Sequence, residues 1–246
     1  MRARQGIFSR SADIARTAVI GARVVTATLA SAVHAIALAA LTPGAAGLHA
    51  VGRAWGRSVL DASGVRVTVS GGEGVEPGRP YVFMANHQSN YDIPVLLGHL
   101  PVEFRWLAKK ELFRIPLFGR AMTAIGSIAI DRGDRESAFG SLRRAADVLA
   151  RGIPMMIFPE GTRSPNGPML PFKKGGFMLA IGSGAPIVPV AIRGTRAVMP
   201  KGRWLITGGE VALVIGKPMA TAGMGPDHRD GLMQRVREAL VQLSEG

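Results

Sequence analysis

A histidine and an aspartate stand five positions apart at His87 and Asp92, a pair that could work together as a general base. In one continuous helix, residues five apart would point about 140° away from each other, because each residue turns the helix by about 100°. We therefore expect His87 on a strand-to-helix turn and Asp92 near the start of the helix, with Pro94 in its first turn. There the carboxylate can hold one imidazole nitrogen while the other nitrogen takes a proton. An aspartate that caps a helix beside a structural histidine is the alternative.

A second polar cluster follows an apolar run that has the length of a strand. It places an acid, a glycine, a hydroxyl and a guanidinium in succession, at Glu160, Gly161, Thr162 and Arg163. Open α/β sheets bind their ligands in the crevice at the carboxyl ends of the strands. The cluster therefore lies where such a sheet has its ligand site. A polar turn with a surface Glu–Arg pair is the alternative.

The segments that position these clusters are short apolar runs that alternate with helical patterns, from about residue 64 onward. Strands are expected at residues 65–69, 81–85, 104–107, 125–130, 154–158, 186–192 and 211–215. Helices are expected at residues 134–150, where Gly152 follows as a stop signal, around 176–181, and from about 227 to 244. Strands alternating with helices predict the α/β class, with a mostly parallel mixed sheet flanked by helices.

The first 60 residues have a different pattern, typical of a segment that associates with a membrane. Residues 1–23 hold five arginines against a single acid, with apolar residues near helical spacing, as in basic helices that lie on anionic bilayers. Residues 24–41 have His34 as their only strongly polar member and would reach about 27 Å as a helix, just short of the hydrocarbon thickness. Pro43 and Gly44 then break the helix, and a helical pattern resumes up to residue 60.

Arginines flank this apolar stretch on both sides, so the positive-inside rule does not orient it. We therefore expect a helical hairpin that dips into one leaflet, in preference to a full span, at the cytoplasmic face of the plasma membrane. A cleaved signal peptide and an organelle transit sequence are the alternatives. The predicted division is a region of membrane-associated helices at residues 1–60 and a globular domain at residues 61–246.

The 246 residues carry 30 Lys and Arg against 17 Asp and Glu, a formal net charge of +13, and contain no cysteine. The absence of cysteine excludes disulfides, thiolate zinc sites and cysteine nucleophiles. The basic surface suits nucleic acid, anionic lipid or phosphorylated metabolites. Nucleic acid is the least favoured of these, because the charge is scattered along the chain and only 6% of the residues are aromatic and able to stack on bases.

Four blocks of the chain, in order, resemble the glycerolipid acyltransferase family, whose type members are 1-acylglycerol-3-phosphate acyltransferases. The first block is an Asn-His-x-Ser-x-x-Asp pattern, in which Asn86 and Ser89 accompany His87 and Asp92. The others are residues 109–119 with their continuation at 126–132, residues 158–164, and residues 188–192. The resemblance covers about residues 81–193 and leaves both ends of the chain to composition.

The resemblance implies the acyltransferase fold and a role for each block. His87 is then the general base on a lysophospholipid hydroxyl, oriented by Asp92, and the freed oxygen attacks an acyl thioester. Direct transfer is expected, because the chain has neither a cysteine nor a Gly-x-Ser-x-Gly elbow. Arg163 is implied as the clamp on the acceptor phosphate. The other implied substrate-binding residues are Glu160, Gly161, Thr162, Asn86 and Ser89, with positive charge from Lys109 or Lys110 and from Arg132.

The resemblance also implies the substrates. Lysophosphatidic acid is the expected acceptor, acyl-CoA or acyl-carrier protein the donor and phosphatidic acid the product, with no metal or other cofactor and with membrane lipids as partners. Another lyso-lipid acceptor, such as a lyso-ornithine lipid, is the alternative within this class. A non-catalytic lipid-binding protein and a thioester hydrolase are the alternatives from other classes.

Overall fold

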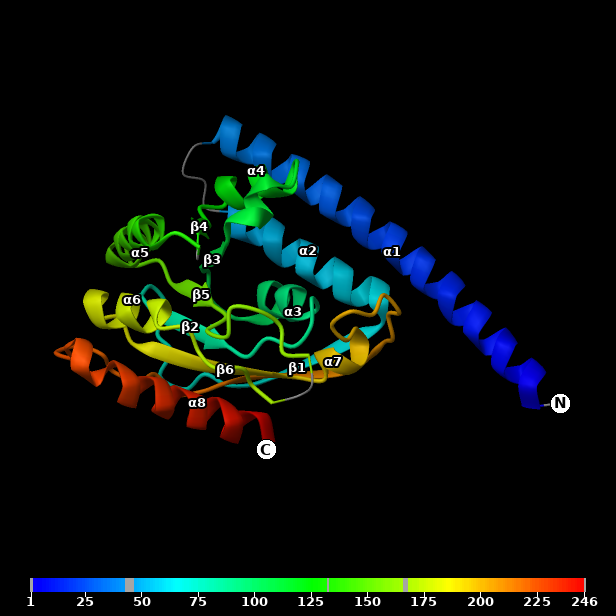
Figure 1. The fold of residues 1–246 in the computed structure, drawn as a ribbon. Helices are drawn as coiled ribbons and strands as arrows, with labels where there is room; N and C mark the ends of the chain where they lie inside the picture. Colours follow the sequence, from blue (N-terminus) through cyan, green and yellow to red (C-terminus); the bar gives the residue numbers. More distant parts are fainter. Residues whose placement is uncertain (1, 43–46, 132, 166–167, 246) are drawn as a thin grey trace.

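A mixed sheet forms the centre of the computed structural model, which describes the chain except for residues 1, 43–46, 132, 166–167 and 246. Its strands are β1 Val65–Gly71, β2 Val82–Ala85, β3 Arg105–Lys109, β4 Ile128–Ile130, β5 Met155–Ile157, β6 Ile187–Arg193 and β7 Gly209–Ile215. They lie in the order β1-β7-β6-β2-β5-β3-β4 (Figure 1). Neighbouring strands are parallel except β6 and β7. The predicted α/β class with a mostly parallel mixed sheet is confirmed.

Helices cover both faces of this sheet (Figure 1). The α-helices are α1 Arg2–Leu41, α2 Leu48–Ser63, α3 Asp92–His99, α4 Phe118–Ala124, α5 Arg135–Ala150, α6 Gly175–Ser183, α7 Thr195–Val198 and α8 Arg229–Glu245, and short 3-10 helices lie at Lys110–Arg114 and Pro226–His228. The helices predicted from residues 134, 176 and 227 are α5, α6 and α8. At the start of α5 the Asp134 side chain accepts the Glu136 amide, which is an N-cap, and Gly152 follows the helix with φ 80°.

Strand β2 explains why the strands are continuous apolar runs. Phe83 and Ala85 belong to one hydrophobic core, to which α2 and α3 also contribute, whereas Val82 and Met84 belong to a second core with α5, α6 and α8. All four side chains are fully buried. A parallel strand covered on both faces has no solvent side, so it does not alternate between apolar and polar residues.

The basic and apolar parts of the N-terminal region form one continuous helix, α1, which is about 60 Å long at about 1.5 Å per residue. One face of α1 packs on the rest of the protein. Ile20, Ala32 and Ala35 are buried there, and Trp55 Nε1 of α2 donates to Thr28 Oγ1 over 2.9 Å. The apolar stretch of α1 is therefore in contact with the globular part at these residues.

A neighbouring face of α1 is exposed and apolar. Val25, Leu29 and Val33 follow one another at four-residue spacing along it and are all exposed. The segment Asp13–Leu41 is long and apolar enough to cross a membrane. The helix break predicted at residues 43–44 lies outside the described residues.

Helix α2 packs closely on α3 and so sets the position of the residues at the start of α3. A Cβ atom on Gly56 would lie 2.7 Å from the Pro94 carbonyl oxygen and 2.8 Å from the Gly98 nitrogen, so only glycine fits without a shift. Beside this contact, Arg57 Nε donates to the Gly98 carbonyl over 3.1 Å. The domain division predicted at residue 60 falls inside α2 and stays a prediction.

Candidate active site

The first polar cluster lies on the turn that joins β2 to α3, at the carboxyl end of the central strands. Asn86 attaches this turn to β6: its Nδ2 donates to the Ile192 carbonyl over 3.0 Å, and the Ile192 amide donates to its Oδ1 over 2.7 Å. Gln88 Nε2 donates to the same carbonyl over 2.7 Å. These bonds give Asn86 a structural role, and its place in substrate binding stays a prediction.

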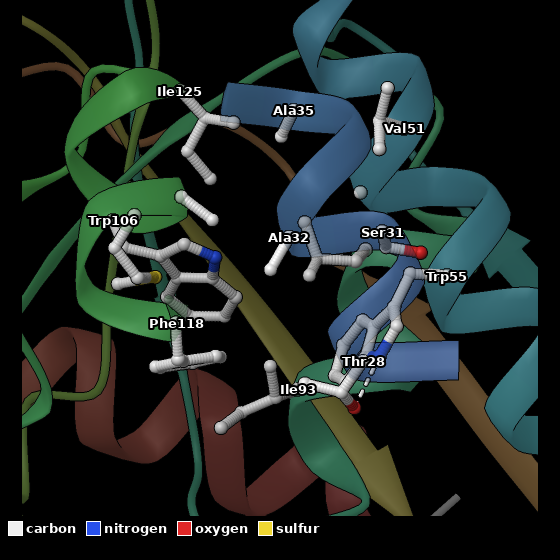
Figure 2. A pocket seen from close by; sticks show the side chains of 14 residues that line it. Thr28, Ser31, Ala32, Ala35, Val51, Trp55, Ile93, Trp106, Phe118 and Ile125 are labelled. Atoms are coloured by element: carbon white, nitrogen blue, oxygen red, sulfur yellow. Dashed lines mark hydrogen bonds between the residues drawn. The ribbon is translucent and has the colours of Figure 1, made fainter. Parts of the chain in front are cut away.

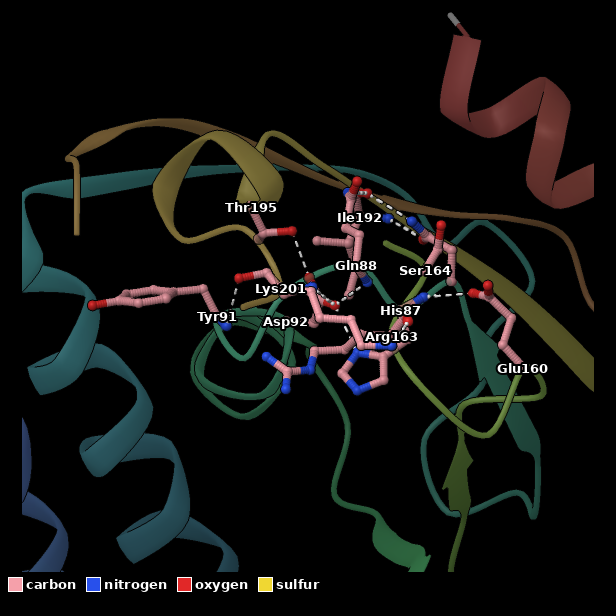
Figure 3. A network of polar contacts seen from close by, with 12 residues as sticks. His87, Gln88, Tyr91, Asp92, Glu160, Arg163, Ser164, Ile192, Thr195 and Lys201 are labelled. Carbon is pink, nitrogen blue, oxygen red and sulfur yellow. Dashed lines mark hydrogen bonds and ion pairs between the residues drawn. The ribbon is translucent and has the colours of Figure 1, made fainter. Parts of the chain in front are cut away.

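His87 and Asp92 are in contact, with 2.8 Å between Nδ1 and Oδ2 (Figure 3). Asp92 is the first residue of α3 and is fully buried. Its Oδ2 also accepts the backbone amides of Gln88 and Ser89, over 2.7 and 2.9 Å, and its Oδ1 accepts the Thr195 hydroxyl. Hydrogen bonds to both oxygens hold the carboxylate in one orientation.

This contact determines what the His87 ring can do. An ionised carboxylate only accepts hydrogen bonds, so the proton of neutral His87 belongs on Nδ1 and the lone pair of Nε2 is available to a substrate. The side chain is 14% exposed, and its ring stacks on Phe158 with centroids 3.9 Å apart and planes 10° apart. Stacking and the bond to Asp92 together fix the ring in the orientation that a general base needs.

Glu160 supports the His87 turn from the second polar cluster. Its Oε1 accepts the His87 amide over 2.8 Å, and its Oε2 accepts the Leu170 amide over 2.7 Å. Burial raises the pKa of Glu160 above its usual value, and the two amide donors counteract part of that rise. The carboxylate is thus bound to backbone, so this geometry fits a positioning residue, and direct substrate contact by Glu160 stays a prediction.

Two hydrogen bonds to the peptide group between Arg163 and Ser164 hold Arg163 next to His87. The Ser164 amide donates to the His87 carbonyl over 2.7 Å, and Lys201 Nζ donates to the Arg163 carbonyl over 2.9 Å (Figure 3). The Arg163 side chain is half-buried. Its guanidinium can therefore bind an anion close to the general base.

Gly161 and Thr162 line a polar pocket with residues of the second sequence block. Lys109, at the end of β3, and Lys173, just before α6, line the same pocket, and so do the acidic residues Glu111, Asp131 and Glu160. The structure thus brings the predicted Lys109, Gly161 and Thr162 together, with Lys173 as a further cation. The lysines are the groups in this mixed-charge pocket that can bind a phosphate.

The other two predicted cations differ from Lys109. Lys110 lines the polar pocket but is paired with Asp131, and the hydrogen bond from Lys110 is the largest cause of the lowered pKa of Asp131, followed by the Gly133 amide. Arg132 lies outside the described residues. Within the described ranges, no three His, Asp or Glu side chains come together as a metal site would require.

Ser89 and Thr195 both make hydrogen bonds at the buried side of the turn that joins β2 to α3, which we call the catalytic turn. Ser89 is fully buried; its Oγ donates to the Met199 carbonyl over 2.8 Å and accepts the Tyr91 amide over 3.1 Å. Ser89 therefore has structural contacts, and its place in substrate binding stays a prediction. Thr195 was missed by sequence reasoning. The signal in the sequence is a hydroxyl two residues after the end of β6, a strand next to β2, at the same edge of the sheet.

An apolar cavity lies among α1, α2, α3, α4 and β3 (Figure 2). Trp106 in its wall contacts Phe158, with ring centroids 5.5 Å apart, and Phe158 is the ring on which His87 stacks. Ile93 in the wall is the residue after Asp92. The other lining residues are Thr28, Ser31, Ala32, Ala35, Val51, Gly52, Trp55, Leu97, Phe118, Ala121, Met122 and Ile125. The lining suits hydrocarbon, and the volume of about 80 Å³ would hold only part of a fatty acyl chain.

The chain is similar to acyltransferases in sequence and in structure. The family model described as acyltransferase matches residues 66–193. The crystal structure of the 1-acyl-sn-glycerophosphate (LPA) acyltransferase PlsC from Thermotoga maritima superposes with a TM-score of 0.80 and 29% identity, covering 95% of each chain.

Curated relatives agree with the structural match. A 1-acyl-sn-glycerol-3-phosphate acyltransferase of Pseudomonas aeruginosa is 35% identical over 74% of this chain and 72% of its own length. Relatives with the same kind of name from Chlamydomonas reinhardtii, 37% identical, and Homo sapiens, 35% identical, match over 71% and 73% of this chain. The match covers only 53% and 64% of those two longer relatives. By the family model and by these identities, the chain belongs to the acyltransferase family.

Proposed function

We propose that the chain transfers a fatty acyl group from a thioester donor, acyl-CoA or acyl-carrier protein, to the free hydroxyl of lysophosphatidic acid, giving phosphatidic acid. The observation that carries this proposal is the His87–Asp92 pair with Nε2 left open beside Arg163. The names of the relatives from Pseudomonas aeruginosa and Thermotoga maritima support the same acceptor. A lipid-binding protein without catalysis would not need a buried carboxylate fixed against the one histidine of the turn.

The reaction needs no covalent enzyme intermediate. His87 Nε2 takes the proton of the acceptor hydroxyl while the oxygen attacks the thioester carbonyl, and the Asp92 carboxylate stabilises the imidazolium that forms. The carbon–sulfur bond then breaks, and the leaving sulfur takes the proton back from Nε2. One ester forms for each thioester broken, and the enzyme returns to its starting state. The chain has no cysteine that could carry the acyl group instead.

The polar pocket and the apolar cavity bind different parts of the substrates: the first binds the acceptor's headgroup and the second the acyl chain. Arg163 takes the phosphate, because a guanidinium pairs with its oxygens, and Lys109 and Lys173 add positive charge from the pocket lined by the neighbouring Gly161 and Thr162. The apolar cavity that reaches Trp106 takes hydrocarbon. His87 contacts Glu160, which lines the polar pocket, and Phe158, which contacts Trp106 in the apolar cavity. The acceptor hydroxyl oxygen and the thioester carbonyl carbon then meet at His87.

Replacing Arg163 with lysine should raise the KM for lysophosphatidic acid about tenfold, because lysine keeps the charge but loses the paired hydrogen bonds to phosphate. The KM for the acyl donor should stay within a factor of about two. Both constants are measured by initial rates at varied acceptor and donor. Arg143→Lys, on the exposed surface of α5, is the matched control and should change neither. Equal rises in both KM values would show that Arg163 binds the donor or stabilises the fold and does not bind the acceptor phosphate.

The acceptor itself is tested with a panel of lyso-lipids. Reconstituted protein is offered labelled acyl-CoA or acyl-carrier protein with lysophosphatidic acid, lysophosphatidylcholine, lysophosphatidylglycerol and lyso-ornithine lipid, and each product is identified by mass. The proposal expects phosphatidic acid to be formed far faster than any other product. Faster turnover of lyso-ornithine lipid, or of a lysophospholipid without a phosphomonoester, would show that this lipid is the acceptor and that lysophosphatidic acid is not.

We also propose that α1 attaches the protein to the cytoplasmic leaflet without crossing it. The packing of Ile20, Ala32 and Ala35 on the body supports this, because the face of α1 that packs on protein cannot also face lipid. The exposed stripe of Val25, Leu29 and Val33 would then enter the leaflet from the side. Lysophosphatidic acid and phosphatidic acid are bilayer lipids, so this placement brings the site to its acceptor.

Cysteines at residues 10 and 57 should both react with a membrane-impermeant thiol reagent from the cytoplasmic side of sealed vesicles. The variants are Arg10→Cys and Arg57→Cys, each in a chain with no other cysteine. Inverted and right-side-out vesicles are compared, and solubilised protein shows that both positions can react at all. Labelling of the two cysteines from opposite sides would establish a transmembrane helix and defeat the proposal.

A further inference from the structure

A tryptophan is held in solvent by an ordered surface segment, residues 199–207, between α7 and β7. Trp204 is 86% exposed, and Leu205 beside it is also exposed. The segment is closed by a bond from the Thr207 amide to the Val198 carbonyl over 2.9 Å. A large apolar ring on a fixed backbone keeps its unfavourable hydration until a partner covers it. We call residues 199–207 the Trp204 segment.

The charge of the Trp204 segment indicates which partner fits. Lys201 and Arg203 are exposed on either side of Gly202, and Arg196 precedes them, whereas no acidic residue occurs between residues 194 and 209. Tryptophan flanked by basic side chains is the composition of membrane interfaces: the ring sits among the headgroups and the cations meet lipid phosphates.

The Trp204 segment lies against α1. The Ile206 amide donates to Thr17 Oγ1 over 3.2 Å, and a Cβ atom on Gly208 would lie 3.1 Å from an Arg16 guanidinium nitrogen. In Figure 1 the segment, in orange, lies where the end of α2 and α1 come together. Ile14 on the same part of α1 is exposed as well. The segment that carries Trp204 therefore contacts the part of α1 that carries the exposed Ile14.

The other side of the Trp204 segment is bonded to the active site. Met199 accepts the Ser89 hydroxyl on the catalytic turn over 2.8 Å, and Lys201 Nζ donates to the Arg163 carbonyl over 2.9 Å. These two bonds fix the distance from Trp204 to His87 and Arg163, so a surface that binds Trp204 lies at a fixed distance from the active site. A contact through α1 alone would leave the protein free to roll about the helix axis.

We propose that the Trp204 segment is a second membrane contact, separate from α1 and α2, which binds the headgroup layer of an anionic bilayer. Trp204 enters the interface, and Lys201 and Arg203 pair with lipid phosphates. Together with α1 this contact gives the protein two points of attachment and turns the crevice of His87 and Arg163 toward the bilayer surface. Lipid quenching of Trp204 and binding to vesicles can be measured without turnover, so both test this contact whether or not the protein is an acyltransferase.

Quenching by brominated lipids tests the position of Trp204. The full chain is bound to vesicles of phosphatidylcholine and phosphatidylglycerol whose acyl chains carry bromine, and the emission of Trp204→Phe is subtracted from that of the unmodified chain, which removes the signal of Trp55 and Trp106. The Trp204 component should lose at least half of its intensity. The matched control is Trp204→Phe/Phe139→Trp, because Phe139 is 55% exposed on α5, which packs near β4 at the opposite end of the sheet from β7. This tryptophan should not be quenched.

The charge of the segment is tested by vesicle titration at low lipid concentration. Arg203→Glu should lower the partition constant onto anionic vesicles at least fivefold, since each basic residue near such a surface contributes about that factor, and should have little effect on neutral vesicles. Arg143→Glu on α5 is the control for charge. An unquenched Trp204, equal quenching at position 139, or a Trp204 emission that responds to an acidic acyl-carrier protein and not to vesicles would each overturn the proposal.

Discussion

Replacing His87 with alanine is expected to lower the rate of acyl transfer by a factor of about 10² to 10⁴ while the protein stays folded. A hydroxyl near neutral pH is a weak nucleophile, and Nε2 of His87 is the nitrogen that the bond to Asp92 leaves free to take its proton. Initial rates with lysophosphatidic acid and acyl-CoA measure the loss. Substrate binding should be little affected, because the ring lies against Phe158 and not in the polar pocket.

Two controls separate chemistry from folding in this experiment. The His87→Ala protein should unfold at nearly the same temperature as the unmodified chain, since only a partly buried ring is lost. His228→Ala, at an exposed histidine before α8, should keep full activity. Near-normal turnover by folded His87→Ala protein would remove His87 from the mechanism.

Replacing Asp92 with asparagine is expected to cost a factor of about 10³ in kcat. The asparagine amide can donate to Nδ1, which moves the ring proton to Nε2 and blocks the base; the same exchange in a serine-protease triad costs about 10⁴. KM for both substrates should change by less than about threefold, because Asp92 is fully buried behind the ring. Rates at saturating substrate give the comparison.

Asp92 also accepts the Gln88 and Ser89 amides, so Asp92→Asn could disturb the turn itself. Thr195 offers a cleaner variant of the same test, because its hydroxyl reaches only the other carboxylate oxygen, Oδ1. Thr195→Val should lower kcat about tenfold with KM unchanged, and Thr195→Ser should restore it. A loss that Thr195→Ser does not restore, or one that appears in KM, would assign Thr195 to packing and leave the orientation of Asp92 unsupported.

Much of the site was predictable because parallel strands end at one edge of a sheet. The apolar runs before residues 86 and 158 identified β2 and β5, and the five-residue spacing placed His87 and Asp92 on opposite ends of a turn, as observed. Patterns of apolar residues also located the other strands, because every strand in the middle of the sheet is covered on both faces.

The orientation of individual polar groups was not predictable. An acid at residue 160 could turn to a ligand or to backbone amides, and only the fold shows that Glu160 takes the amides of His87 and Leu170. Thr195 joins Asp92 because β6 lies next to β2, and a single sequence does not reveal the order of strands. The packed face of α1 was hidden for a similar reason: alanines at residues 32 and 35 fit a membrane segment and a protein contact equally well.

The central claim is that a thioester and a lyso-lipid hydroxyl react directly at His87. It is tested by counting both products of one reaction with protein reconstituted in vesicles, measuring free thiol from acyl-CoA and phosphatidic acid by mass in the same samples over time. We expect one phosphatidic acid for each thiol released, no thiol release when lysophosphatidic acid is left out, and loss of both products in His87→Ala. Thiol released without acceptor, with free fatty acid in place of phosphatidic acid, would contradict the account and make the protein a thioester hydrolase.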